Sequence, residues 1–248
     1  MIEEKFFDEK KDITPEDWKE IKNEIEKGFD STEDFLRYAF AVKILDPKMK
    51  IEIGNKAEEI KERIEDMPVP ELSSYEKENC PPLPPADDLA ELYSAIATIK
   101  IIDPKLQLGT KELWKGALES LKELKTLTNS KDSRKVEILT SLAFYMKIID
   151  PLLDIDGIIG DTGWENIQKS FYEFKNIDFA AKIKVLNPKI DLKLNEGDWQ
   201  LMKENLLKAR AEKNYYVVDG FTPLAATMKI LAADKITITE NGLELVNK

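Results

Sequence analysis

Apolar residues recur at spacings of three and four along most of the chain, the period of a helix with one buried face. Near the N-terminus, Thr14 and Pro15 have the chemistry of a helix cap and a first helical residue, and Trp18, Ile21 and Ile25 follow on one face. The same period continues downstream. It predicts helices that begin at residues 31–32 and at Thr222, one that carries Ile60 and Ile64, and others over 89–102, 111–127, 133–149, 164–174, 179–186 and 198–213.

A short motif marks the ends of several of these helices. It consists of Lys, Ile or Val, an aliphatic residue, Asp or Asn, and Pro. The complete copies begin at Lys43, Lys100, Lys147 and Lys184, and a fifth copy, Lys229-Ile230-Leu231-Ala232, lacks the proline. Successive lysines are 57, 47, 37 and 45 residues apart. A residue that precedes proline is disfavoured in helical geometry, so each motif predicts a helix end. The recurrence predicts a tandem helical repeat with insertions of different lengths.

The tryptophans share one place in this repeat. All four, Trp18, Trp114, Trp164 and Trp199, stand near the start of the second helix of a unit. A large aromatic at a fixed repeat position is typical of a core anchor, although it could also line a groove for a partner. The predicted fold class is therefore all-α, with tandem helix-pair repeats in an α-solenoid-like array and short extended connectors between the helices. The paired helices of each unit are similar to those of HEAT and tetratricopeptide arrays, without the residue signatures of either.

Several segments alternate between apolar and polar residues instead. After the helix ends, the alternating pairs are Ile51/Ile53, Leu106/Leu108, Leu153/Ile155 and Ile190/Leu192, and the chain closes on a strand-like run from Ile236 to Thr239. Such short runs predict extended connectors that pack on the helices, and full strands are not expected at these lengths.

Prolines divide the chain. Residues 67–88 contain six of the twelve prolines, so they cannot form one continuous helix. We expect three regions: residues 1–66 with an N-terminal half-unit and the first repeat, a Pro-rich linker or insertion over 67–88, and the remaining repeats over 89–248 with a degenerate last unit.

Composition narrows the functional classes. The chain has no histidine, one cysteine (Cys80), and a formal charge of −11 over 248 residues. Without histidine, the commonest general base and metal ligand is missing. The negative charge disfavours nucleic acid as a partner, and no apolar run approaches the length of a membrane span. A single cysteine fits a reducing compartment, so a cytoplasmic location is expected, or an exported one if a leader has been removed.

The five repeat lysines are the candidate partner-binding residues: Lys43, Lys100, Lys147, Lys184 and Lys229. Stacked repeats would align them in a basic ladder able to hold an acidic peptide. The alternative is that each lysine neutralises the negative end of its helix and bonds to the last carbonyls.

The segment from Asp154 to Glu165 has two sharper interpretations. As a calcium loop it offers Asp154, Asp156 and Glu165, but an isoleucine stands where the loop needs glycine. In addition, Asp156-Gly157-Ile158-Ile159-Gly160, with Thr162, Trp164, Ile167, Gln168 and Phe171, resembles the Asp-Gly-x-x-Gly-x-x-Thr turn-helix of the peptidoglycan-binding three-helix domain. Gly163 stands where that family has its threonine. The resemblance implies cell-wall binding by an exported protein, whereas the simplest alternative is a tight turn before a helix.

No catalytic motif, metal-ligand set or cofactor fingerprint is present in the sequence, so no cofactor is expected. The first functional hypothesis is a non-catalytic macromolecular interaction scaffold with a protein partner. The alternative is an exported protein that binds peptidoglycan or another glycan. An enzyme that uses carboxylates is a third class without positive support from the sequence.

Overall fold

The computed structural model describes residues 7–66, 86–105, 108, 111–127, 132–217, 220–233, 235–239 and 242–246. It confirms that the protein is mainly helical. The helices are α1 (Glu9–Asp12), α2 (Pro15–Lys27), α3 (Thr32–Leu45), α4 (Lys56–Asp66), α5 (Ala86–Ile102), α6 (Lys111–Lys122), the 3₁₀ turn η1 (Glu123–Lys125), α7 (Ser133–Ile149), α8 (Ile155–Phe174), α9 (Ile177–Leu186), α10 (Glu196–Ala211) and α11 (Phe221–Ala232).

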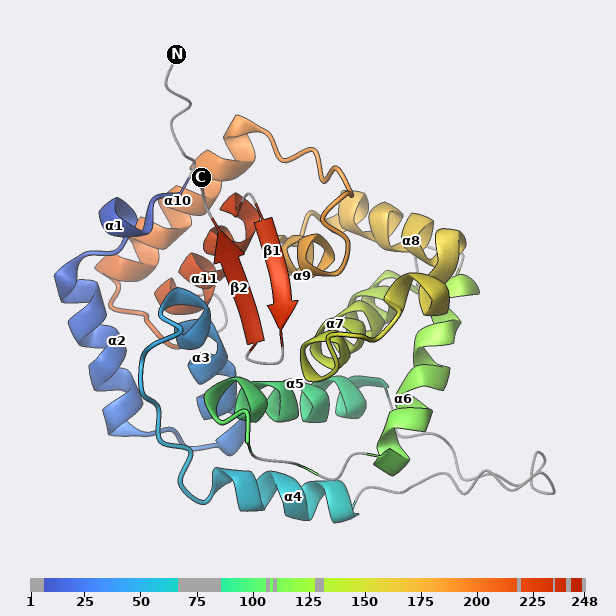
Figure 1. The fold of residues 1–248 in the computed structure, drawn as a ribbon. Helices are drawn as coiled ribbons and strands as arrows, with labels where there is room; N and C mark the ends of the chain where they lie inside the picture. Colours follow the sequence, from blue (N-terminus) through green and yellow to red (C-terminus); the bar gives the residue numbers. More distant parts are fainter. Residues whose placement is uncertain are drawn as a thin grey trace.

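The helices form two concentric layers. The inner helices α3, α5, α7, α9 and α11 pack against one another in that order, and α11 packs back against α3 (Figure 1). The outer helices α2, α4, α6, α8 and α10 surround them. The predicted α-solenoid-like array is not confirmed, because contacts between α11 and α3 close the inner helices into a ring. Closure buries faces that the terminal units of an open array would expose to water.

The repeated motif forms a helix stop with a defined function for each residue. Asp46, Asp103, Asp150 and Asn187 each donate their backbone N–H to a carbonyl four residues earlier, at 2.8 Å. Each side-chain oxygen then accepts a hydrogen bond from the backbone N–H two residues later, at 2.9 to 3.2 Å. The intervening proline has no N–H that would need a helical partner. The sequence signal for a helix end is thus explained by local chemistry.

The C-terminal segment forms a β-hairpin, although its short alternating run predicts only an extended connector. Strands β1 (Lys235–Thr239) and β2 (Gly242–Val246) are antiparallel, and Ile236 pairs with Leu245 while Ile238 pairs with Leu243. These four apolar side chains pack on the core, and the strands contact α5 and α7. The hairpin begins just after α11 ends and is drawn across the ring in Figure 1. Tertiary packing on the ring stabilises a hairpin that would be marginal alone.

Two other local expectations need correction. Helix α8 begins at Ile155, so this residue is helical and the helix starts well before Trp164; Gly160 interrupts it with φ 64° and ψ 176°. Residues 67–85 of the expected Pro-rich linker lie outside the described residues, as does Leu106, whereas residues 86–88 form the first turn of α5. The regions on either side of this segment pack together, since α3 and α4 both contact α5.

The tryptophans all lie on outer helices and face inward. Trp199 is buried, at 6% exposed, and Trp18, Trp114 and Trp164 are half-buried against the core. The expected anchor position is correct, although only one of the four side chains is fully enclosed. Among the helices that the structure describes, none has the length and apolar character of a membrane span.

Candidate functional site

The five repeat lysines lie in the last turns of the five inner helices, two or three residues before each helix ends. Lys100 donates to the carbonyl oxygen of Ile149 at the end of α7. Lys184 donates to Leu231 at the end of α11, and Lys229 to Leu45 at the end of α3, the last at 2.7 Å. In each case a lysine reaches the end of the next inner helix, so the inner helices run parallel and their C-terminal ends meet on one side of the ring.

The other two lysines bond within their own units. Lys43 donates to the carbonyls of Pro47 and Met49 at 2.5 and 3.2 Å, and Lys147 donates to that of Leu153 at 2.6 Å. Burial lowers the pKa of Lys43, and the charge of Asp46 partly offsets this. All five side chains are half-buried. Donation to carbonyls near the negative helix ends favours the structural interpretation, and a partner on these lysines stays a prediction.

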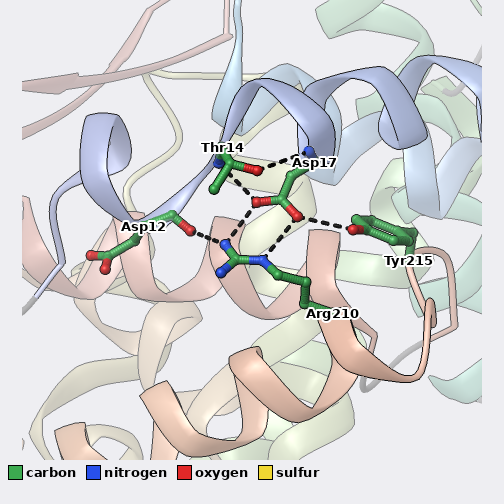
Figure 2. Close-up of polar contacts among 5 residues, drawn as sticks. All are labelled: Asp12, Thr14, Asp17, Arg210 and Tyr215. Atoms are coloured by element: carbon green, nitrogen blue, oxygen red, sulfur yellow. Dashed lines mark hydrogen bonds and ion pairs between the residues drawn. The ribbon is translucent and has the colours of Figure 1, made fainter.

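A buried ion pair joins two neighbouring outer helices, one near each end of the chain. Arg210 on α10 donates to both carboxylate oxygens of Asp17 on α2, from Nε at 2.9 Å and from Nη2 at 2.7 Å. Tyr215 donates its hydroxyl to Asp17 at 2.9 Å, and the Thr14 backbone N–H donates at 2.8 Å. Figure 2 shows these groups converging on the carboxylate, with Arg210 also reaching the Asp12 carbonyl at 2.7 Å. We call the junction where α11 packs against α3 and Arg210 of α10 pairs with Asp17 of α2 the seam of the ring, and we call this cluster the seam clamp.

Both oxygens of the Asp17 carboxylate accept hydrogen bonds within the seam clamp. Asp17 is 1% exposed. Burial alone would raise the pKa of Asp17, but hydrogen bonds from Thr14, Arg210 and Tyr215 outweigh burial and hold the pKa below its ordinary value. Burial and the Asp17 carboxylate raise the pKa of Tyr215, so its hydroxyl stays protonated and donates. This arrangement stabilises ring closure.

A second charged cluster lies between α7 and α9. The Lys182 ammonium is 2.7 Å from the Asp178 carboxylate and donates to the Ser141 hydroxyl at 3.0 Å. Its neighbour on α7, Glu137, accepts a 2.6 Å hydrogen bond from the side-chain amide of Asn176. Asn176 also caps α9 through its side-chain oxygen, so the residue that starts the helix positions the carboxylate.

The interior of the ring borders this cluster. Phe40 on α3 contacts Phe144 and Tyr145 on α7, with ring centroids 5.9 and 6.0 Å apart. Since α5 separates these helices in the ring, the contact crosses the interior. Lys182 lies 5.9 Å from the Tyr145 ring, so its ammonium faces the same interior.

Burial and neighbouring charges shift the pKa values of two groups in this cluster. Burial would lower the pKa of Lys182, but Asp178, Tyr145 and Glu137 reverse the effect and raise it. These neighbours favour the charged ammonium, which donates to the Ser141 hydroxyl. Burial raises the pKa of Glu137, and Lys182 partly opposes this. Burial and neighbouring charges therefore shift both Lys182 and Glu137 toward their protonated forms.

An acidic hollow of about 310 Å³ lies between the start of α3 and the face of α4 that runs from Glu59 to Asp66. Arg63 pairs with Glu33, and the Thr32 hydroxyl donates to Glu59. Ile60 lies beneath the hollow and is fully buried in the core. Five carboxylates and one guanidinium give the lining a formal charge of −4; the acids are Asp30, Glu33, Glu59, Glu62 and Asp66. The hollow can therefore receive a cationic group, which would meet both charge and hydrogen-bond acceptors.

Sequence reasoning missed this hollow, although part of its signal was present. On α4, Glu59, Glu62 and Asp66 are separated by three and four residues, which places them on one helix face. Their pattern is the same as that of an ordinary solvated surface. Only the packing of α4 beside the start of α3 brings Asp30 and Glu33 to the same place.

The acidic turn before Trp164 has local structural functions. Asp154 caps α8 by accepting from the Gly157 N–H at 3.0 Å, and Asp156 accepts from the Trp164 indole at 2.9 Å. Among the described residues, no group of three or more acidic or Cys side chains could hold a metal ion. The calcium interpretation therefore gains no support from the geometry, and the resemblance to the peptidoglycan-binding turn stays a prediction.

Comparison with family models, with curated proteins and with solved structures found no match to this chain.

Proposed function

We propose that this protein is a non-catalytic interaction scaffold that binds a protein partner, and that the acidic hollow between α3 and α4 receives a basic side chain of that partner. The hollow carries the proposal because it is a recessed site whose lining side chains have a formal charge of −4. An arginine offers a planar donor array that matches the carboxylates of the lining.

Long-range electrostatics support a basic partner surface. The chain has a formal charge of −11, so its mean field attracts cationic surfaces and speeds their encounter with the protein. The lysines that oppose this field bond to carbonyls at the other ends of the inner helices, away from the hollow at the start of α3. Charge and shape therefore favour the same kind of partner.

The non-catalytic part of the proposal rests on the sequence, which has no histidine and no assembled catalytic motif. In the seam clamp, donors from Thr14, Arg210 and Tyr215 occupy the Asp17 carboxylate, and in the second cluster Asp178, Tyr145 and Glu137 raise the pKa of Lys182. Turnover of any small substrate, abolished by one point substitution in either cluster, would overturn this part.

The hollow is tested with a triple variant that leaves its internal bonds intact. Asp30→Asn, Glu62→Gln and Asp66→Asn remove three charges while Glu33–Arg63 and Thr32–Glu59 remain. The matched control, Glu91→Gln, Glu165→Gln and Glu244→Gln, removes the same charge from exposed positions elsewhere. Each protein serves as bait in affinity purification from native lysate, and captured partners are identified by mass spectrometry and reconstituted with purified components.

A partner that binds the wild type and the control, but binds the hollow variant about tenfold or more weakly, would support the proposal, since each lost charge pair contributes on the order of 1 kcal/mol. The reconstituted complex should also weaken as salt is raised. Equal capture by all three baits would show that the hollow is not the site.

A further inference from the structure

The N-terminal segment of residues 7–13 lies against the seam of the ring. It contains the four-residue helix α1, and both of its apolar ends are buried, with Phe7 1% and Ile13 3% exposed. A single helical turn has no stability of its own in water. The segment is therefore ordered by what it contacts, as a bound peptide would be.

Two cations of the ring hold the polar part of the segment. Lys229 on α11 forms a 2.5 Å ion pair with Glu9, in which the lysine side chain is 12% exposed and the glutamate 35% exposed. Arg210 on α10 donates to the Asp12 backbone carbonyl at 2.7 Å, as Figure 2 shows. The ring therefore contacts the segment at three points: the buried Phe7 side chain, the Glu9 carboxylate two residues later, and the Asp12 backbone carbonyl.

Other bonds position both cations independently of the segment. Lys229 donates to the Leu45 carbonyl, and Arg210 pairs with Asp17 and lies 5.0 Å from the Phe221 ring. The receptor groups would keep their geometry if the segment left, because the ring itself supplies these contacts. A site of this kind binds without the cost of ordering its own side chains.

We propose that the seam is a peptide-binding surface for segments with an apolar anchor followed two positions later by an acidic residue, and that residues 7–13 occupy it within the same chain. A partner segment with this chemistry binds by replacing them. The seam surface is separate from the acidic hollow, and its partner is acidic where that of the hollow is basic.

Residues 7–13 compete with any added peptide for the seam, and this competition sets the apparent affinity of the peptide. A tethered segment has an effective concentration in the millimolar range, so it weakens the apparent affinity for any free peptide. Releasing the segment should therefore uncover binding that the wild type hides.

The experiment uses the full chain and a fluorescein-labelled peptide of residues 7–14, Phe-Asp-Glu-Lys-Lys-Asp-Ile-Thr. The double variant Phe7→Ala/Glu9→Gln weakens the internal segment, and fluorescence anisotropy measures peptide binding. The variant should bind the peptide about tenfold or more tightly than the wild type does. Adding Lys229→Gln should reverse this gain, whereas adding Lys147→Gln, a repeat lysine without a bond to the segment, should not.

A folded double variant that binds no better than the wild type would overturn the proposal. So would equal binding of a peptide that carries Ala and Gln in place of Phe7 and Glu9. The triple variant of the acidic hollow should leave peptide binding unchanged, so failure at one surface is distinguishable from failure at the other.

Hydrogen exchange on the wild type provides a test that needs no variant. The amides of Lys11, Asp12 and Ile13 bond within the segment, to the carbonyls of Asp8 and Glu9. They should exchange by local opening at least about tenfold faster than core amides of α3, and faster still with excess peptide. Exchange of these amides only by global unfolding would show that the segment is a fixed part of the core and would overturn the proposal.

Discussion

Two charged pairs join neighbouring parts of the ring, and they differ in almost every physical respect. Asp17 and Arg210 are 193 residues apart in the chain, and the carboxylate is enclosed. Lys182 and Asp178 are one helical turn apart, and the Asp178 side chain is 59% exposed. The first pair connects the beginning and the end of the chain, whereas the second lies within one helix and reaches its neighbour through Ser141.

The difference shows which kind of charge stabilises a closed ring. A buried carboxylate that accepts hydrogen bonds from Thr14, Arg210 and Tyr215 becomes costly to disrupt, since each loss leaves a desolvated group unpaired. A carboxylate in water can exchange its partner for solvent with little change in free energy. The seam clamp therefore stabilises closure, and the Lys182 cluster is the more replaceable of the two.

The largest expected effect comes from removing one partner of each pair. Asp17→Ala should lower the free energy of unfolding by about 3 kcal/mol, because Arg210 and Tyr215 lose their shared acceptor in a buried place. Asp178→Ala should cost about 1 kcal/mol or less, since its carboxylate is mostly hydrated. Urea denaturation followed by circular dichroism measures both, and equal losses would contradict the distinction.

The Asp17 carboxyl of the seam clamp and the Glu137 carboxyl of the Lys182 cluster should contribute to the pH dependence of stability with opposite signs. The pKa of Asp17 is held below its ordinary value of 3.8, so its contribution is complete above that value and is lost as pH falls through the lower, folded pKa. The pKa of Glu137 is raised above 4.5, so its contribution is present below 4.5 and is lost as pH rises through the folded pKa.

Urea unfolding of the wild type, Asp17→Asn and Glu137→Gln at pH values on either side of 4.5 measures this contrast. Asp17→Asn should flatten the acid limb of the stability curve, and Glu137→Gln should flatten the loss that accompanies rising pH. A pH profile that neither substitution changes would count against both assignments.

Two buried tyrosines extend the comparison to neutral groups. Tyr38 lies at the seam, where its hydroxyl is 3.2 Å from that of Thr222, and Tyr38→Phe should cost about 0.5–1.5 kcal/mol. Tyr93 on α5 has a buried hydroxyl without a hydrogen-bond partner in the described part of the chain. Tyr93→Phe should therefore be neutral or stabilise by up to about 1 kcal/mol. Thermal unfolding of both variants would reveal an error if Tyr93→Phe were the more damaging.

The smallest effects belong to the repeat lysines. Lys147→Gln should cost about 0.3–1 kcal/mol, the range for a cation at a helix C-terminus. Lys229→Gln should lie at or slightly above the top of that range, since it also loses Glu9. Substituting Lys100, Lys147 and Lys184 together tests the ladder: partner capture should survive with slightly lower stability. Loss of capture with an intact fold would mean that an acidic partner binds the lysines.

Local features of the fold follow directly from the sequence. The Asp-Pro and Asn-Pro elements end helices because the acceptor side chain and the missing N–H act within a few residues of each other. Helical periodicity located most helices, and the shared position of the tryptophans placed them on one layer, with Trp199 the most enclosed. These signals depend on near neighbours, which a single sequence displays.

The candidate sites depended on contacts that the sequence does not display. Nothing near Asp17 indicates that Arg210 is its partner, and nothing near Lys229 indicates that it bonds to Leu45. The repeat explained why a lysine recurs at each helix end, but only the structure showed that three of these lysines reach the next inner helix. The acidic face of α4 was visible as a pattern, yet its meaning depended on the position of α3.

Ring closure separates most clearly what the sequence determines from what tertiary packing decides. The sequence by itself determined a series of helices with buried faces and marked ends, and such a series is compatible with an open array or a closed ring. Whether the array closes depends on the angle between successive units and on the fit of α11 against α3, which are summed over the whole chain. Tertiary packing alone decided that fit, and it then placed the seam clamp, the N-terminal segment and the hairpin.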